Sequence, residues 1–93
     1  MSDGIVTRAS FSKFCFLSGA VNHLSVICSK KIFKKAVDRN RIQRVYKACF
    51  TDLITALPTG TYVVVVKRGV TQINWGDQYK EVRNEWLSLI QAF

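Results

Sequence analysis

Groups for acid–base catalysis and for metal binding are scarce in this chain. Its 93 residues contain six carboxylates and one histidine, His23. Asp77, Glu81 and Glu85 fall on one face of a predicted helix, but interleaved basic residues favour a solvated, salt-bridged face over a magnesium site. The serines and the histidine find no third partner for a triad. The sequence therefore predicts no catalytic residue and no metal site in the protein itself.

Long apolar runs and cysteine motifs are missing too. No stretch of 18 apolar residues exists, so we expect no segment that spans a bilayer. The N-terminus lacks the basic patch and apolar core of a signal peptide. Cys15, Cys28 and Cys49 form no C-x-x-C pair, which favours buried free thiols in a reducing cytosol over disulfides or a zinc site. We expect a cytoplasmic protein with no membrane partner.

Positive charge is what the chain has in excess. Fourteen lysines and arginines against six acids give a net charge of +8, which points to nucleic acid or an anionic membrane surface. Apolar residues make up 48% of the sequence, which argues against disorder, and the length suits one domain. Residues 1–10 show little pattern, and we expect them to fray. Residues 11–93 are expected to form the single domain.

Three segments have the pattern of β-strands. Residues 11–17 alternate, with Phe14 and Phe16 on one face. Residues 23–29 predict a second strand, joined to the first by a hairpin. The valine-rich residues 62–67 predict a third strand that is central and buried on both faces.

Two further segments have the period of helices. The first helix begins near Asp38, its predicted N-cap, and ends near Leu57. Asn74 caps a second helix that continues to the C-terminus. The order strand, helix, strand implies a parallel pair beside the hairpin. We therefore predict an α+β fold, a two-layer sandwich in which a mixed sheet of three to four strands carries a crossover helix and a C-terminal helix.

The basic residues concentrate on and before the first helix. Eight of the fourteen lie within residues 29–50. At about 100° per residue, one helix arc is polar and lies opposite the apolar arc. The residues of this polar arc are Asn40, Arg41, Arg44 and Lys47. Guanidinium forks match phosphate oxygens, and a helix N-terminus favours anions. These basic residues either bind a polyanion or form a charged face that is exposed to solvent.

These residues resemble the signature of a known family, the bacterial ribonuclease P protein component. The resemblance rests on the run Ser29–Ile32 (SKKI), on Ala36 and Val37, on Arg39–Arg41 (RNR) and on Arg44. It extends over residues 11–93. Two departures stand out, because Phe33 replaces a glycine of the family and one extra residue precedes Ala36. The ten residues before Phe11 do not supply the helix that usually opens the family, so we expect either a shortened variant or another element that covers the same face of the sheet.

The resemblance implies a fold and a function. The fold would be that of ribonuclease P proteins, similar to domain 2 of ribosomal protein S5, with a left-handed βαβ crossover. One protein would bind one catalytic RNA and the precursor tRNA and support 5′-end maturation. That RNA would perform the cleavage, with Mg²⁺ held by the RNA and the substrate. The protein would thus be part of an endoribonuclease without having an active site of its own.

Site residues follow from the same resemblance. The RNA-binding positions would be Lys30, Lys31, Arg39, Asn40, Arg41 and Arg44, and Lys47 joins them because it shares their face. The aromatic pair Phe14 and Phe16 would line a cleft for the single-stranded 5′ leader, because bases stack on aromatic rings. Ordinary core packing is the alternative for this pair. A basic RNA-binding module like a ribosomal protein, without a processing role, is the alternative for the whole chain.

Overall fold

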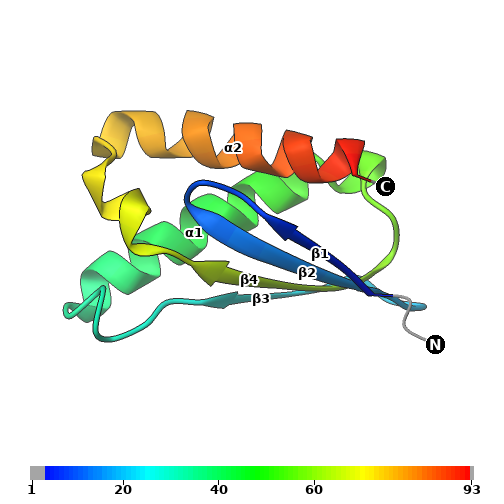
Figure 1. The fold of residues 1–93 in the computed structure, drawn as a ribbon, viewed down its shortest axis with the longest axis horizontal. Coiled ribbons are helices and arrows are strands. Elements are labelled where there is room, and N and C mark those ends of the chain that lie inside the picture. The colour runs from blue at the N-terminus through cyan, green and yellow to red at the C-terminus, as the bar shows by residue number, and fades with distance from the viewer. Residues whose placement is uncertain (1–3, 93) are drawn as a thin grey trace.

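A computed structural model describes residues 4–92, in which four strands form one mixed sheet in the order β1–β2–β4–β3 (Figure 1). The strands are β1 Gly4–Arg8, β2 Ser12–Ser18, β3 His23–Ile27 and β4 Gly60–Val66. β2 runs antiparallel to both β1 and β4, whereas β3 runs parallel to β4. The predicted α+β fold with a mixed sheet is therefore confirmed.

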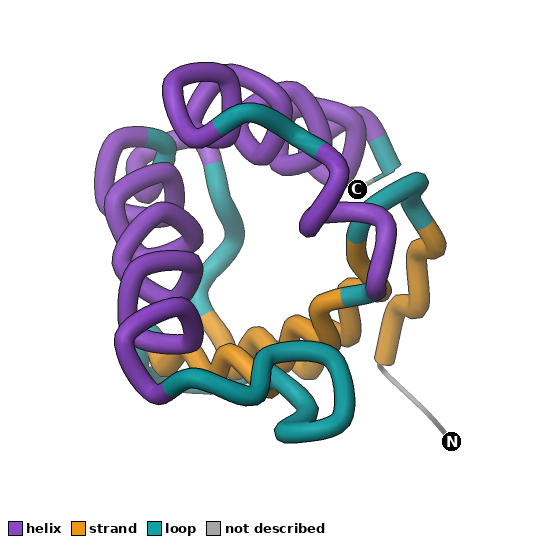
Figure 2. Tube along the Cα trace, turned by 90° about the vertical axis from the view of Figure 1, so that its left-hand side faces the viewer, coloured by secondary structure: helices purple, strands orange, loops and turns teal. Residues whose placement is uncertain are grey.

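Two long helices cover one face of this sheet. α1 spans Ala36–Asp52 and connects β3 to β4, and α2 spans Trp75–Gln91. The short 3₁₀ turns η1, Ile54–Ala56, and η2, Arg68–Gln72, precede β4 and α2. Both helices lie on the same side of the sheet (Figure 1, Figure 2). The fold thus has the two layers that the sequence predicts.

Aromatic rings fill the space between the sheet and the helices. Trp86 of α2 is fully buried, and its ring centroid lies 4.9 Å from that of Phe14 in β2 and 5.5 Å from that of Phe50 in α1. Tyr62 of β4 lies 5.9 Å from Trp86 and 4.8 Å from Phe16. Each such pair contributes about 0.5–1.5 kcal/mol beyond the burial of its area. The cluster therefore ties both helices to the two middle strands.

The N-terminus differs from the sequence prediction. The expectation that residues 1–10 fray is wrong for Gly4–Arg8, because this segment pairs with β2 from Gly4 opposite Leu17 to Arg8 opposite Lys13. A five-residue strand offers too short an alternation to stand out in the sequence. Residues 1–3 of the same prediction lie outside the described residues.

The predicted hairpin between the second and third segments is wrong, because β4 lies between β2 and β3. Phe14 of β2 and Val26 of β3 both pair with Val64 of β4, from its two edges. The turn after β2 instead approaches the start of β4, where the Gly60 N–H donates to Asn22 Oδ1 at 3.2 Å. A run of four valines suits a strand with neighbours on both edges, and β4 takes that place.

The central position predicted for β4 is confirmed, but its burial on both faces is not. Val64 is fully buried under the helices, whereas Val65 exposes 38% of its surface on the opposite face. That face also presents Val6, Leu17 and Ile27 as exposed side chains. The sheet thus has one face packed and one open, because both helices lie on a single side.

The first helix begins earlier than predicted. Lys35 is the N-cap, its side chain makes no capping hydrogen bond, and Ala36 is the first helical residue. Asp38 therefore lies in the first turn, where a carboxylate interacts favourably with the helix dipole, and not at the cap. α1 ends at Asp52 instead of near Leu57, because η1 tightens the chain into a 3₁₀ turn.

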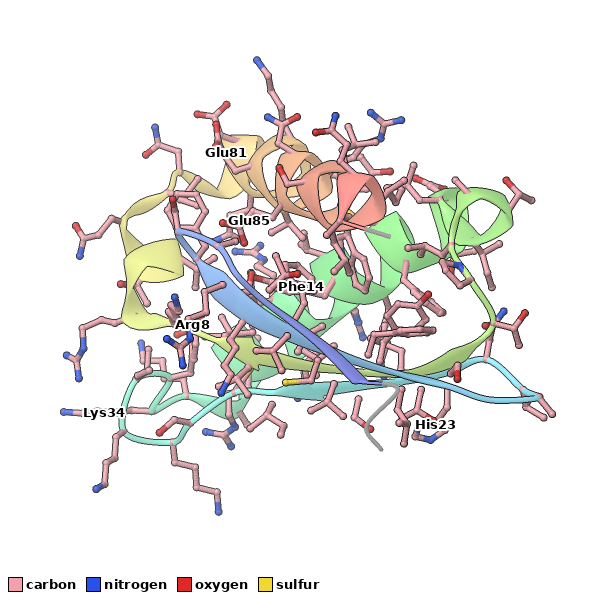
Figure 3. All side chains as sticks on the ribbon, turned by 45° about the vertical axis from the view of Figure 1, so that its right-hand side comes forward. Arg8, Phe14, His23, Lys34, Glu81 and Glu85 are labelled. Carbon is pink, nitrogen blue, oxygen red and sulfur yellow. The ribbon has the colours of Figure 1, made fainter. Side chains whose placement is uncertain are left out.

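One buried carboxylate joins the helices and the sheet. Glu85 of α2 is 7% exposed and accepts hydrogen bonds from Ser12 Oγ and from the Phe11 N–H at 2.7 Å (Figure 3). Ser12 Oγ also lies 2.6 Å from Tyr46 Oη of α1. Burial raises the pKa of Glu85, and the two hydrogen bonds and the charge of Lys67 offset part of that rise. The predicted solvated face is therefore wrong for Glu85.

The raised pKa of Glu85 predicts a pH dependence of stability. In the folded state, Glu85 keeps a proton at pH values at which the unfolded chain has already lost it. The contribution of Glu85 to stability is therefore complete below the pKa of the unfolded state, and it is lost as the pH rises through the pKa of the folded state. Glu85→Gln should remove that loss. In urea unfolding from pH 4 to pH 8, the difference in unfolding free energy, variant minus wild type, should increase with pH. Asp77→Asn, which removes an exposed carboxylate of α2, is the control. A difference independent of pH would contradict the assignment.

Candidate nucleic-acid interface

The outer side of α1 carries the predicted basic arc. Its inner side consists of Ile42, Tyr46, Cys49 and Phe50, all buried. The residues on its outer side are Asn40, Arg41, Arg44 and Lys47, all exposed. The helix has this division because the two sets alternate at intervals of three and four residues. Four of the seven predicted RNA-binding residues thus share one surface.

A groove of about 500 Å³ runs along this surface. Its walls are Val37, Asp38, Asn40, Arg41, Arg44 and Val45. Two guanidinium groups and an amide offer planar hydrogen-bond donors in fixed directions, and the valines add apolar surface. This mixture suits a phosphodiester chain, whose phosphates accept hydrogen bonds and whose sugars are partly apolar.

The loop before α1 adds further positive charge. It forms a tight turn in which Ser29 O accepts from the N–H groups of Ile32 at 3.1 Å and Phe33 at 2.8 Å. The turn separates the side chains, because Phe33 is buried and Ile32 is half-buried while Lys30 and Lys31 are exposed. The chain order then brings this loop directly to the start of α1.

Two more lysines of this loop belong to the same exposed set. Lys34 and Lys35 are exposed, and Lys34 reaches away from the body of the molecule (Figure 3). Neither is among the predicted RNA-binding residues, because the resemblance to the family signature breaks down between Phe33 and Ala36. The positive charge of these two lysines was the signal that could have identified them as RNA-binding residues.

Arg39 has a different place from the other predicted RNA-binding residues. It is half-buried, and its Nη1 donates to the backbone oxygens of Phe33 at 2.7 Å and Lys34 at 3.4 Å. Arg39 therefore ties the basic loop to the first turns of α1. It thereby holds the loop that carries the exposed lysines against the start of the helix that carries the exposed arginines.

The three cysteines form no disulfide. All three are free, with Cys49 buried and Cys15 and Cys28 half-buried. Burial raises the pKa of Cys28 to about 11 despite the opposing charge of Arg39, and burial likewise raises the pKa of Cys49 to about 11. Both side chains are therefore neutral thiols near pH 7, and neither supplies a reactive thiolate.

The predicted leader-binding aromatics lie in the core. Phe14 is 1% exposed and Phe16 is 5% exposed, and their rings pack against Trp86 and Tyr62. Because these contacts hold both rings against other core rings, neither presents a face on which a base could stack. Core packing, the alternative interpretation, matches this environment. Alternation alone showed that the two rings share a face of the strand, but it could not show that both helices cover that face.

Residues 4–92 contain no group of three histidine, cysteine, aspartate or glutamate side chains placed to hold a metal ion. Within the same range, no helix has the length and apolar character needed to cross a membrane.

Comparisons with known proteins relate this chain to one family. The model of a family described as Ribonuclease P matches residues 5–90. A ribonuclease P protein component from Nitratiruptor sp. is 30% identical over 88 residues, which cover 95% of this chain and 76% of the relative. One from Borrelia duttonii is 34% identical over 71 residues, which cover 74% of this chain and 61% of the relative. The chain thus spans between three fifths and about three quarters of the length of these two relatives.

Solved structures show the same fold. The ribonuclease P protein from Thermotoga maritima superposes with a TM-score of 0.79 at 19% identity, covering 98% of this chain and 84% of that chain. The one from Staphylococcus aureus superposes with a TM-score of 0.77 at 15% identity, covering 96% and 80%. Together with the family model and the curated relatives, the fold and the basic signature identify this chain as a member of the ribonuclease P protein family.

Proposed function

We propose that this chain is the protein subunit of a ribonuclease P, where it binds the catalytic RNA and precursor tRNA and supports maturation of the tRNA 5′ end. The observation that carries the proposal is the set of exposed basic residues on the loop before α1 and on the outer side of α1, two segments that Arg39 joins. Membership of the family supports the choice of enzyme. Such a complex would work in the cytoplasm.

The charge of the chain supports a mainly electrostatic mechanism. Two folded RNAs repel each other, and a protein with a net charge of +8 can lie against both. Each lysine or arginine that neutralises a phosphate releases condensed counterions, so that affinity falls steeply as salt is added. The arginines of α1 add directed hydrogen bonds to this general attraction. The protein would therefore lower the magnesium concentration that the complex needs.

The chemistry itself is assigned to the RNA. Mg²⁺ held by the RNA and the substrate would activate the attacking water and stabilise the leaving oxygen, while the protein residues bind and orient the RNA. Contact with the 5′ leader belongs to the same proposal. It has to use exposed surface, because Phe14 and Phe16 are buried.

Reconstitution tests the proposed function. Adding the protein to a bacterial ribonuclease P RNA at low magnesium should increase the cleavage rate of precursor tRNA. Arg44→Ala should weaken binding to that RNA by about 1–3 kcal/mol and reduce the slope of log affinity against log salt by about one, because it removes one phosphate contact. Filter binding across a salt series measures both.

Arg83→Ala is the matched control, because Arg83 is exposed on α2 and its loss changes the net charge equally. It should leave affinity close to that of the wild type. Tight RNA binding without faster cleavage would favour an RNA-binding module that has no processing role. Equal losses in the two variants would contradict the placement of the interface on α1.

Alanine variants of Arg39 and Arg44 should separate an effect on protein stability from an effect on RNA binding. Arg39→Ala leaves the carbonyls of Phe33 and Lys34 without a donor, so it should lower the free energy of unfolding by about 1–3 kcal/mol. Arg44→Ala removes an exposed side chain and should change that quantity by less than about 0.5 kcal/mol. Urea unfolding measures both variants. Equal stabilities of the two variants would show that Arg39 does not hold the loop.

A further inference from the structure

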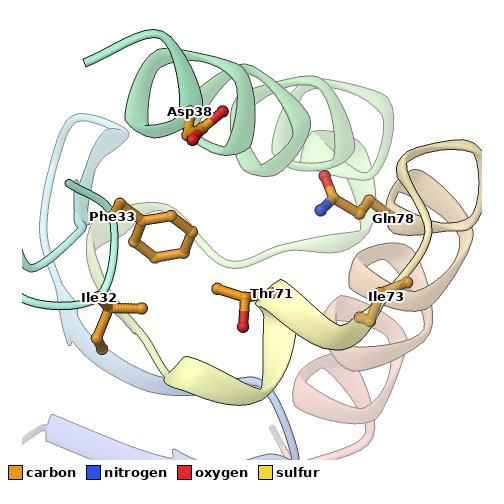
Figure 4. Close-up of a pocket in the computed structure, with 6 residues that line it drawn as sticks. All are labelled: Ile32, Phe33, Asp38, Thr71, Ile73 and Gln78. Atoms are coloured by element: carbon orange, nitrogen blue, oxygen red, sulfur yellow. The ribbon is translucent and has the colours of Figure 1, made fainter. Parts of the chain in front are cut away.

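A second hollow lies beside the basic groove, on the other side of the first turn of α1. It has a volume of about 300 Å³. It lies where the loop before α1, the turn η2 and the beginnings of both helices meet (Figure 4). The residues that line it are Ile32, Phe33, Asp38, Thr71, Ile73 and Gln78. Its volume is at the lower end for small-ligand sites.

Gln78 is the polar group that this cavity leaves unsatisfied. Its side chain is only 2% exposed and its amide points into the cavity from α2 (Figure 4). Its Oε1 atom is buried and has no hydrogen-bond partner among the residues that the structure describes. A buried acceptor without a donor costs free energy, so a ligand that brings an N–H donor would be stabilised here.

Asp38 supplies a second acceptor and connects the cavity to the RNA surface. Its side chain is half-buried and lines both this cavity and the basic groove. A nucleotide with its phosphate beside Arg41 and Asn40 in the groove would therefore have its base near the mouth of the cavity. Asp38 repels anions, so the part of the ligand that enters must carry hydrogen-bond donors.

The remaining walls are mainly apolar and include one aromatic ring, and their one polar member, Thr71, donates its hydroxyl to Arg68 O at 2.7 Å. Phe33 contributes its ring, and Ile32 and Ile73 contribute aliphatic surface. Aromatic side chains are the usual surface on which proteins stack unpaired RNA bases, whose Watson–Crick edges are then read by polar groups. Phe33 is one of the two departures from the family signature, so this wall belongs to the present chain.

We propose that this cavity binds one unstacked guanine of the RNA. Guanine alone among the four bases has an imino N–H beside an amino group on its Watson–Crick edge, so it can donate to Asp38 and to Gln78 Oε1 together, with its ring against Phe33. Adenine and cytosine offer only the amino group there, and uracil only the imino group. The inference rests on the proposed function in taking RNA as the partner.

Titration of the wild-type protein with single nucleotides tests this. GMP, AMP, CMP and UMP share a phosphate, so differences between them report the base. GMP should shift the NMR signals of the Ile32 and Ile73 methyl groups and of the Gln78 amide, and it should bind about 5- to 150-fold more tightly than AMP, the range for one bidentate base contact. Equal binding of all four, or unmoved signals, would overturn the proposal without any variant.

Two matched variants then locate the recognition. Asp38→Asn keeps the size of the side chain but replaces one acceptor oxygen with a donor, so the preference for GMP over AMP should fall towards one. Asp77→Asn removes a carboxylate at the same position of the first turn of α2, outside the cavity, and should leave the preference unchanged. Equal effects of the two variants would also overturn the proposal.

The failures of the two proposals are distinguishable. If GMP does not bind but Arg44→Ala still weakens RNA binding, only the guanine site is wrong. If GMP binds selectively while the full RNA neither binds through α1 nor is cleaved faster, the ribonuclease P assignment fails and the nucleotide site stands.

Discussion

Packing of Tyr46 and Phe50 against the sheet fixes how α1 is rotated about its axis. Tyr46 is fully buried and its hydroxyl lies 2.6 Å from Ser12 of β2, while the ring of Phe50 lies 5.3 Å from that of Tyr62 in β4. With that side held, the opposite side of the helix can only face solvent. The basic surface thus depends on apolar and aromatic contacts on the far side of the same helix.

Arg39 extends this order from the helix to the loop before it. A free loop over residues 28–35 would spread its charges over many arrangements, and each lysine would lose entropy on binding. The hydrogen bonds from Arg39 to the carbonyls of Phe33 and Lys34 limit that freedom. The buried ring of Phe33 holds the same turn from the inside. Because this surface is ordered before binding, less of the free energy of its RNA contacts is lost to ordering the loop, and the affinity for RNA is higher.

Strong local patterns are the part of this molecule that could be predicted. The valine run of β4 and the three- and four-residue spacing of α1 and α2 identified these elements and the exposed face of α1. The pairing of strands depends on long-range contacts, so the insertion of β4 between β2 and β3 could not be predicted from local spacing. The same limit explains the wrong predictions for Phe14 and Glu85. The pattern of apolar residues in one element does not reveal which of its faces another element covers. The cavity beside Asp38 needs four segments to meet and had no local signal.

Protection of lysines by RNA tests the central claim most directly. Acetylation of the protein, free and bound to ribonuclease P RNA, followed by mass spectrometry, reports each exposed amine. We expect Lys30, Lys31 and Lys47 to be protected by RNA and Lys80, which is exposed on α2, to react equally in both states. Protection of Lys80 with no protection of Lys47 would contradict an RNA interface built on the outer side of α1.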